Sequence, residues 1–302
     1  MRSLFFGIKN HRKKEKPMSE INWFPGHMAK TLRLLEDQIR SVDAVIELCD
    51  ARAPYATRNP LLMKLIGQKQ HLLVLNKVDL ADKAVTGAWL TYFSKIGVKA
   101  VKYKSIGGKP REIFKLIEEA VRDKVEHMKM RGAMKTVRVM VVGIPNVGKS
   151  TFINALKGQA IAKTADRPGV TRSNQWVKIN PFLDLLDTPG MLWPRLDDQK
   201  TALRLAFLGS IRDEIMDSEQ LAKELLKELS VIAPKELAAR YKLEESDLNM
   251  EPNALLESCC RHRGFLLSGG RYDTLRCAQI VLDEFRSAKI GRITLERVGG
   301  VL

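Results

Sequence analysis

The sequence predicts an α/β domain with a mostly parallel sheet, followed by a smaller domain made only of helices. Three observations support this prediction. Apolar runs typical of strands alternate with helical stretches as far as about residue 200, which indicates parallel β-α-β units. One of these strands runs directly into a glycine-bearing loop and a helix. Beyond residue 200 the strand signals nearly vanish, in a chain of 302 residues that is long enough for two domains.

The composition is that of a globular protein, with 45% hydrophobic and 28% charged residues. No apolar run approaches the roughly 20 residues of a membrane span, so we expect no stable membrane association. The formal net charge of +16 favours a polyanionic partner, either nucleic acid or an acidic membrane surface. Because aromatic residues are only 6% of the chain, phosphate contacts with structured RNA fit better than stacking on single-stranded bases, and we expect no DNA partner.

The four cysteines have no CxxC spacing, so the sequence indicates neither a zinc site nor a disulfide framework. A reducing compartment follows, and we expect the cytoplasm. Residues 1–17 form a basic tail that is rich in lysine and poor in serine, which is weak evidence for a targeting peptide. A mitochondrial address stays open as the alternative. Met18 follows the tail. The tail is therefore either the product of an upstream start or a true basic arm.

The first patterned segment is a predicted helix after Met28. Its apolar positions are Leu32, Leu35, Ile39 and Val42. Strands are predicted at residues 44–49, 71–75, 98–103, 137–142 and 182–186. Pro110 opens a helix with one apolar face, and Gly132 marks its end.

In the C-terminal part, only helical patterns are strong. They cover residues 203–208, 221–229, 237–243, 255–260 and 272–285. We therefore predict three parts, namely a basic tail (1–17), an α/β domain (18–200) and a helical domain (201–302).

The strongest local signal is the segment 143–150, Gly-Ile-Pro-Asn-Val-Gly-Lys-Ser, which fits GxxxxGK[ST] between a strand and a helix. The backbone N–H groups of such a loop wrap nucleotide phosphates. Lys149 is expected to neutralise the β- and γ-phosphate oxygens in catalysis, and Ser150 to offer its hydroxyl to Mg²⁺. The loop residues expected to bind the nucleotide are Asn146, Val147, Gly148, Lys149, Ser150 and Thr151. The alternative is a chance match on a glycine turn.

Two further elements fit the phosphate end of a nucleotide. Asp187-Thr188-Pro189-Gly190 follows an apolar run, which places Asp187 at a strand end where a carboxylate holds Mg²⁺ through water. The Gly190 amide is expected to sense the γ-phosphate. Thr171 lies between the two elements and is expected to give Mg²⁺ a second hydroxyl. Alone, the Asp-Thr-Pro-Gly segment is also compatible with a simple turn, and a lone threonine has little specificity.

Base identity is predicted from residues 76–79, Asn-Lys-Val-Asp, at the end of another apolar strand. The Asp79 carboxylate can accept hydrogen bonds from N1–H and the exocyclic N2–H of guanine, whereas adenine has no proton on N1. The predicted ligand is therefore GTP or GDP, and a metabolic ATPase or kinase is disfavoured. The loop after the next strand would donate a backbone N–H to the guanine O6. The predicted base-binding residues are Asn76, Lys77, Asp79, Ser105, Ile106 and Gly107.

The base-binding motifs precede the phosphate-binding motifs, whereas an ordinary small GTPase has the phosphate motifs first. The same sheet can form in a chain that begins and ends at a different loop, because chain termini can move to surface loops without altering the core. We therefore predict a P-loop GTPase domain with circularly permuted motif order. In this order the chain leaves the phosphate-sensing segment directly into the helical domain, and we hypothesise that nucleotide state is coupled to the position of that domain.

This order of motifs resembles the circularly permuted GTPases of ribosome assembly, and most closely the ribosome biogenesis GTPase A family with its mitochondrial relatives. Two further segments carry the resemblance, Trp-Phe-Pro-Gly-His-Met at residues 23–28 and Asp-Ala-Arg-Ala-Pro at residues 50–54. It covers nearly everything from Met18 onward. It implies a GTPase that matures the large ribosomal subunit, through a helical domain that binds ribosomal RNA. We expect a monomer.

The resemblance also implies roles for two residues. Met191 follows Gly190, where many GTPases carry a water-orienting glutamine, and a thioether cannot replace that amide. The family attributes the catalytic role to the histidine that is His27 here; a structural role at a helix start is the alternative. Asn146 matches the K⁺ ligand of potassium-stimulated relatives, but asparagine is equally a turn residue.

Basic residues are frequent near the end of the chain and are predicted to contact RNA, although such a run is usually only a solvated surface. They are Arg261, Arg263, Arg271, Arg276, Arg286, Lys289, Arg292 and Arg297. The remaining alternative function is an RNA-binding scaffold that binds GTP and hardly hydrolyses it.

Overall fold

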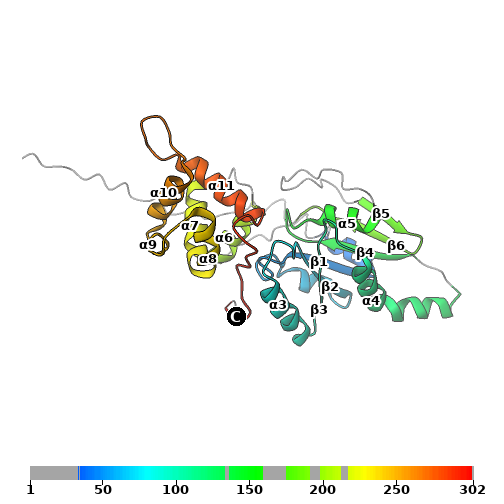
Figure 1. Ribbon diagram of the computed structural model, residues 1–302. Helices are drawn as coiled ribbons and strands as arrows, with labels where there is room; N and C mark the ends of the chain where they lie inside the picture. The colour runs from blue at the N-terminus through cyan, green and yellow to red at the C-terminus, as the bar shows by residue number, and fades with distance from the viewer. Residues whose placement is uncertain are drawn as a thin grey trace, which may run out of the picture.

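The computed structural model describes residue 33 and residues 35–132, 136–158, 175–190, 198–211 and 217–300. Figure 1 shows two regions, a sheet with helices around it and a group of packed helices. We call them the sheet domain (described residues up to 190) and the helical domain (described residues 198–289). The C-terminal segment, residues 290–300, leaves the last helix and passes between them.

A six-stranded sheet forms the centre of the sheet domain. Its strands are β1 (Ala44–Asp50), β2 (Gln70–Asn76), β3 (Lys99–Lys102), β4 (Val137–Val142), β5 (Gln175–Asn180) and β6 (Leu183–Asp187). The order is β3-β2-β1-β4-β6-β5, and every neighbouring pair is parallel except β5 with β6. All of β1 is buried, as expected for a central parallel strand covered on both faces. The predicted α/β class is confirmed.

Helices connect the parallel strands. They are α2 (Leu62–Ile66), α3 (Lys83–Lys95), α4 (Arg111–Met130) and α5 (Lys149–Lys157). Local signals set several of their ends. The Asp82 side chain caps α3 by accepting a hydrogen bond from the backbone N–H of Val85. As predicted, α4 begins after Pro110 and ends before Gly132. Residues 35–41, ahead of β1, are also helical.

The strand prediction is correct for five strands, each within one residue at both ends, and it omits β5. That strand alternates polar and apolar residues, lies at the edge of the sheet and pairs only with β6, in antiparallel fashion. An edge strand needs no buried run on both faces, so its signal in the sequence is weak.

The helical domain contains α6 (Gln199–Phe207), α7 (Ser218–Ile232), α8 (Pro234–Tyr241), α9 (Glu245–Leu248), α10 (Pro252–Arg263) and α11 (Thr274–Arg286). Side chains of Asp198, Asp217 and Asp273 cap α6, α7 and α11, and prolines begin α8 and α10. Each of the five predicted helical patterns coincides with one of these helices. Across the described ranges, the helices are too short or too polar to cross a bilayer.

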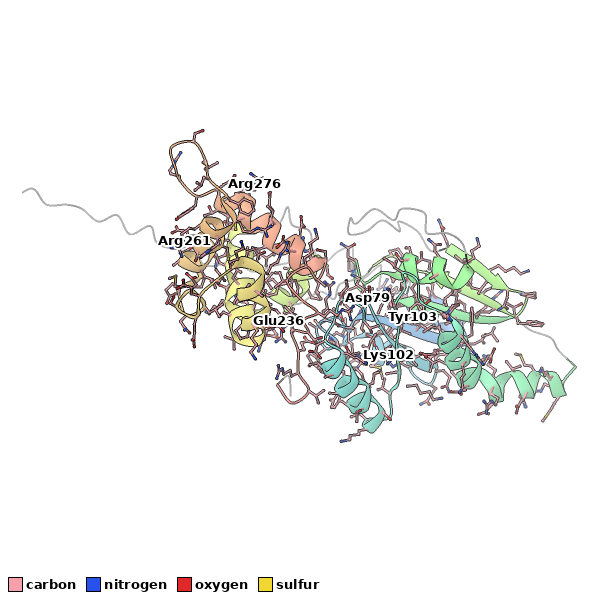
Figure 2. The ribbon with its side chains drawn as sticks, viewed as in Figure 1. Asp79, Lys102, Tyr103, Glu236, Arg261 and Arg276 are labelled. Carbon is pink, nitrogen blue, oxygen red and sulfur yellow. The ribbon has the colours of Figure 1, made fainter. Side chains whose placement is uncertain are left out.

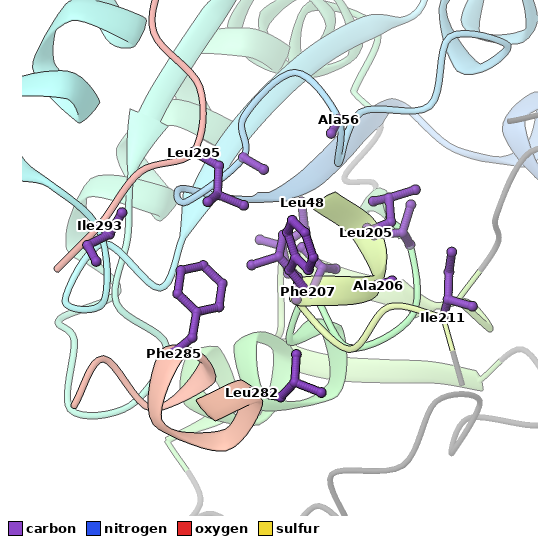
Figure 3. Packing of buried hydrophobic residues seen from close by; sticks show 14 of the residues in the cluster. Leu48, Ala56, Leu205, Ala206, Phe207, Ile211, Leu282, Phe285, Ile293 and Leu295 are labelled. Atoms are coloured by element: carbon purple, nitrogen blue, oxygen red, sulfur yellow. The ribbon is translucent and has the colours of Figure 1, made fainter. Parts of the chain in front are cut away.

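The two domains share one apolar cluster. Figure 3 shows Leu48 of β1 near Phe207 of α6, with Phe285 of α11 and Leu295 of the C-terminal segment beside them. All four side chains are buried. Domains joined only by polar surfaces move easily, whereas a shared apolar core restrains them. The helical domain is therefore packed against the end of the sheet that carries the nucleotide motifs.

Candidate nucleotide-binding site

The predicted motifs meet at one edge of the sheet because they follow the carboxyl ends of neighbouring strands. Asp50 lies opposite Asn76 in the pairing of β1 with β2, and Val141 lies opposite Asp187 in the pairing of β4 with β6. The chain builds outward from β1 to β3 and then returns to the other side of β1 with β4. Open α/β sheets bind ligands at such a reversal of strand order, beyond the carboxyl ends of the strands.

The phosphate loop, residues 143–148, connects β4 to α5. Lys149 is the first residue of α5, and its buried Nζ donates hydrogen bonds to the carbonyl oxygens of Gly143 and Ile144, each at 3.0 Å. Burial lowers the pKa of Lys149 to about 8, while the charge of Asp187 acts in the opposite direction. The ammonium group is thus held against its own loop, where a phosphate would provide it with a counter-charge.

Ser150 and Asp187, two of the predicted Mg²⁺ ligands, lie together. The Ser150 hydroxyl donates to Asp187 Oδ2 at 3.3 Å. A hydroxyl and a carboxylate are oxygen ligands of the kind that Mg²⁺ accepts beside phosphates and water. These two residues therefore fit the metal site. The other predicted ligand, Thr171, and the catalytic candidate His27 lie outside the described residues.

Two glycines allow segments of the site to approach one another closely. A Cβ atom on Gly190 would lie 2.8 Å from Pro145 Cα and 3.1 Å from Lys149 Nζ. Gly148 has a φ of 98°, and a Cβ atom there would lie 2.6 Å from Asn76 Nδ2. The phosphate loop therefore touches the Asp-Thr-Pro-Gly segment on one side and the base-binding motif on the other.

Asn76 joins the base-binding loops to the phosphate loop. Its Oδ1 accepts hydrogen bonds from the N–H and the hydroxyl of Ser105, at 3.1 and 2.7 Å. Its Nδ2 donates to the carbonyl oxygen of Val147 at 2.9 Å. The Asn76 amide thus contacts Ser105 on one side and Val147 on the other, and it holds the two halves of the site together.

The residues predicted to read guanine lie in the loops after β2 and β3. Asp79 is half-buried in the turn after β2, where the N–H of Leu80 donates to the carbonyl oxygen of Lys77 at 2.9 Å. After β3, Ile106 is exposed and Gly107 has a positive φ of 73°. Because β2 and β3 are neighbours, both loops lie at the same edge of the sheet.

Lys77 and Asn146 extend the site toward other elements. Lys77 Nζ donates to the main-chain oxygen of Asn146 at 2.6 Å and lies 3.2 Å from Asp50 Oδ2. The Asn146 side chain donates from Nδ2 to the carbonyl oxygen of Gly209, which follows α6, at 2.8 Å. The residue predicted to hold K⁺ therefore also contacts the helical domain, a contact that its position in the motif does not predict.

Asp50 and Arg52 carry no role in the sequence-based prediction, yet both are buried beside the site. Arg52 Nε and Nη2 donate to the two oxygens of Asp50 at 2.9 and 2.8 Å. Burial alone would raise the pKa of Asp50, but the charges of Arg52 and Lys77 outweigh it and hold this pKa well below its usual range. A charged residue at the end of a mostly apolar strand is the sequence signal that identifies such a position.

Figure 2 shows Asp79, Lys102 and Tyr103 in the sheet domain and Glu236, Arg261 and Arg276 in the helical domain. Two of the basic residues predicted to contact RNA are only half-buried and are held by contacts within the protein. Arg263 pairs with Glu284 at 3.2 Å, and Arg286 is bonded to the end of α6. The exposed members of the set are Arg261, Arg271, Arg276, Lys289, Arg292 and Arg297.

Comparisons with known proteins agree with these motifs. Residues 138–240 match a family model described as 50S ribosome-binding GTPase. The chain is 41% identical over 278 residues to Ribosome biogenesis GTPase A of Bacillus cereus, covering 91% of this chain and 93% of that protein. It is 34% identical to Mitochondrial ribosome-associated GTPase 1 of Mus musculus, covering 91% and 90%. The crystal structure of GNP-bound YlqF from T. maritima is similar with a TM-score of 0.61 and 28% identity, covering 89% of this chain and 99% of that one.

Proposed function

The chain belongs to the ribosome biogenesis GTPase A family, and from that membership we propose that it hydrolyses GTP during late assembly of the large ribosomal subunit, bound to ribosomal RNA. The observation that carries this proposal is the identity of 41% over 91% of the chain, which includes the base- and phosphate-binding motifs. The hydrogen bond of 2.9 Å from Asn76 to the carbonyl oxygen of Val147 supports the proposal, because this contact joins those motifs at one edge of the sheet.

GTP recognition in this proposal divides between two groups of residues. The Asp79 carboxylate accepts from guanine N1–H and N2–H, and the loop containing Ile106 donates to O6. Backbone N–H groups of the phosphate loop surround the phosphates, and Lys149 neutralises the β and γ oxygens. Asn76 keeps the two groups in register through its bonds to Ser105 and Val147.

Mg²⁺, when bound, would supply positive charge to the β- and γ-phosphate oxygens. Ser150 and Asp187 are the described residues that would hold it, and we include Thr171 as a further ligand. Gly190 lies close enough to Pro145 and Lys149 for its amide to respond to the γ-phosphate.

Hydrolysis also requires a positioned water molecule, and Met191 offers no amide for that purpose. In the proposal His27 orients the water, Asn146 contributes an oxygen to K⁺, and turnover is slow until the protein meets its ribosomal target. The exposed basic residues of the helical domain and the net charge of +16 support contact with RNA phosphates. We place the protein in the cytoplasm as a monomer.

The experiment measures GTP turnover with and without purified large ribosomal subunits, in KCl and in NaCl, together with GTP affinity. We expect the subunits to accelerate wild type at least about tenfold. His27→Ala should bind GTP normally and fail to respond. His127→Ala, a change of the same kind at an exposed position of α4, is the matched control and should respond as wild type.

An unchanged wild-type rate in the presence of subunits would favour the second candidate, a GTP-dependent RNA-binding scaffold. That candidate rests on Met191 and predicts tight GTP binding with almost no turnover. Equal turnover in KCl and NaCl would remove the K⁺ part of the proposal while leaving the GTPase in place.

A further inference from the structure

Arg286, at the end of α11, contacts α6 of its own domain through its side chain and the sheet domain through its main chain. The side chain donates from Nε to the carbonyl oxygen of Phe207 and from Nη2 to that of Ala206, each at 3.0 Å. The main-chain oxygen of Arg286 accepts a hydrogen bond from Arg52 Nη1 at 2.9 Å. One residue thus touches the carboxyl end of α6 and the loop after β1.

The first of these contacts leads to the phosphate loop through α6. The guanidinium group satisfies carbonyl oxygens in the last turn of that helix, which have no partners within the helix. Gly209 follows at a φ of 70°, and a Cβ atom there would lie 3.4 Å from Arg286 Cζ. The carbonyl oxygen of Gly209 accepts the hydrogen bond from Asn146 Nδ2 at 2.8 Å. The guanidinium group therefore packs against the residue that holds the Asn146 side chain.

The second contact leads to the phosphate loop through β1. Arg52, bonded to the Arg286 oxygen, makes a bidentate pair with Asp50. Asp50 Oδ2 also lies 3.2 Å from Lys77 Nζ, and Lys77 donates to the main-chain oxygen of Asn146 at 2.6 Å. Asp50 and Arg52 are nearly fully buried, so water does not compete strongly for these bonds.

Both series of contacts begin at Arg286 and end at Asn146, one at its side chain and the other at its main chain. We propose that Arg286 is a positioning residue for nucleotide binding, and that it acts through Asn146 to hold the phosphate loop in its binding conformation. The hydrogen bonds of Arg286, Arg52 and Lys77 in these series are charge-assisted and therefore directional, which helps to fix the loop before the nucleotide arrives. Preorganisation of this kind improves affinity because less conformational freedom is lost on binding. The inference rests on the proposed GTPase function.

Coupling between two sites is reciprocal in binding free energy. If the helical domain holds the phosphate loop through Arg286, then nucleotide binding stabilises the packing of the helical domain by the same amount. In this proposal, Arg286 and Asn146 are the residues that couple the nucleotide state to the helical domain.

The test is a double-mutant cycle on nucleotide affinity, measured by fluorescence titration with labelled GDP and GTP. Arg286→Met keeps the length of the side chain and removes its hydrogen bonds. We expect it to weaken nucleotide binding about three- to tenfold in the wild-type background, the range of coupling through packed networks. In the Asn146→Ala background, where the side-chain contact to Gly209 is already absent, the same change should weaken binding less than about twofold.

Arg52→Met provides a contrast within the cycle. It interrupts the contacts that end at the main-chain oxygen of Asn146, which Asn146→Ala retains. Its effect on affinity should therefore persist in the Asn146→Ala background. Arg263→Met is the matched control, because Arg263 is also a half-buried arginine that pairs with α11, through Glu284, but does not reach α6. It should leave nucleotide affinity within about twofold of wild type.

Thermal melting without nucleotide shows whether each variant is folded, and Arg286→Lys replaces Arg286→Met if the latter melts below the assay temperature. Equal effects of the Arg286 substitution in both Asn146 backgrounds, or no effect in wild type, would overturn the positioning role. In either case normal GTP binding by wild type leaves the GTPase assignment intact. Absence of GTP binding by wild type would instead remove both proposals.

Discussion

The phosphate loop and the C-terminal segment both pack at the end of β1, but different kinds of contact hold them there. A Cβ atom on Gly143 would lie 2.6 Å from the main-chain oxygen of Leu48, and the N–H of Leu295 donates to the oxygen of Arg52 at 2.7 Å. Part of the loop's structure is local, since Lys149 donates a hydrogen bond to Gly143 six positions earlier, and its other contacts come from residues 63 to 71 positions away. The C-terminal segment depends on residues more than 200 positions away.

Glu296 is the centre of the long-range contact. Its side chain is fully buried and accepts hydrogen bonds from the backbone N–H groups of Tyr55 and Ala56, at 2.6 and 3.0 Å. Arg204 of α6 donates to it at 3.2 Å, and its main-chain oxygen accepts from Trp89 at 2.9 Å. A short local pattern in the sequence therefore marks the nucleotide loop, whereas the residues that attach the second domain have no local pattern.

The largest expected effect comes from the local region. Lys149→Ala removes the ammonium group that neutralises the phosphates, and should weaken GTP binding by about 3–5 kcal/mol, roughly a hundredfold to several thousandfold. Equilibrium titration with labelled GTP measures it. Lys157→Ala, at the exposed end of the same helix, should bind as wild type. Comparable losses in both variants would show that Lys149 has no specific role.

The next effect concerns stability and comes from the long-range region. Glu296→Ala leaves two backbone N–H groups without their acceptor and removes one of the acceptors of the buried Arg204, which keeps Glu228 and the Leu295 oxygen. It should lower the free energy of unfolding by about 3 kcal/mol. Urea denaturation measures this loss, with the exposed Glu257→Ala as control. GTP affinity below the transition should stay within about twofold of wild type. A large loss of affinity would mean that the two regions are not separable in this way.

A smaller change in affinity should alter the preference for the base. Asp79→Asn replaces a carboxylate with an amide that can donate, so GTP should lose about 2 kcal/mol, near thirtyfold, from its unmatched hydrogen bonds. Xanthosine triphosphate, which carries a carbonyl in place of the guanine amino group, should bind the variant more tightly than it binds wild type. Competition titrations with both nucleotides measure this change in relative affinity. Parallel losses for the two nucleotides would exclude Asp79 from base recognition.

The smallest effect is a pH dependence of GTP affinity. Because burial lowers the pKa of Lys149 to about 8 from an ordinary 10.5, the free protein loses this positive charge above pH 8. Bound phosphate favours the charged form, so affinity should fall as pH rises above 8, by at most about tenfold per pH unit, and stay constant below 7. Lys149→Arg keeps its charge and should lack the decline. An equal decline in both proteins would assign it to another group.

Much of the fold follows from the sequence because the strands of a parallel sheet are buried on both faces. Residues 137–142 read as a strand from their apolar run alone, and the structure agrees. The edge strand β5 is absent from the prediction because it has no such run. Helix ends were predictable where Pro110 and Gly132 mark them.

The site divides in the same way. Ser150 and Asp187, or Asn76 and Ser105, are predicted from motifs at strand ends and lie within hydrogen-bond distance of each other. The contact of Asn146 with Gly209 could not be predicted, because it depends on how the two domains pack. The roles proposed for His27 and Thr171 stay predictions, since both residues lie outside the described part of the chain.

The distance along the chain between Arg52 and Arg286 also bears on how the protein folds. Their hydrogen bond joins residues 234 positions apart, and the bonds of Glu296 to Tyr55 and Ala56 span 241 and 240 positions. Contacts of such sequence separation form slowly, because the entropy of closing a long loop is lost before the contact returns any energy. The sheet is therefore expected to assemble first, and the docking of the helical domain against β1 to be a late step in folding.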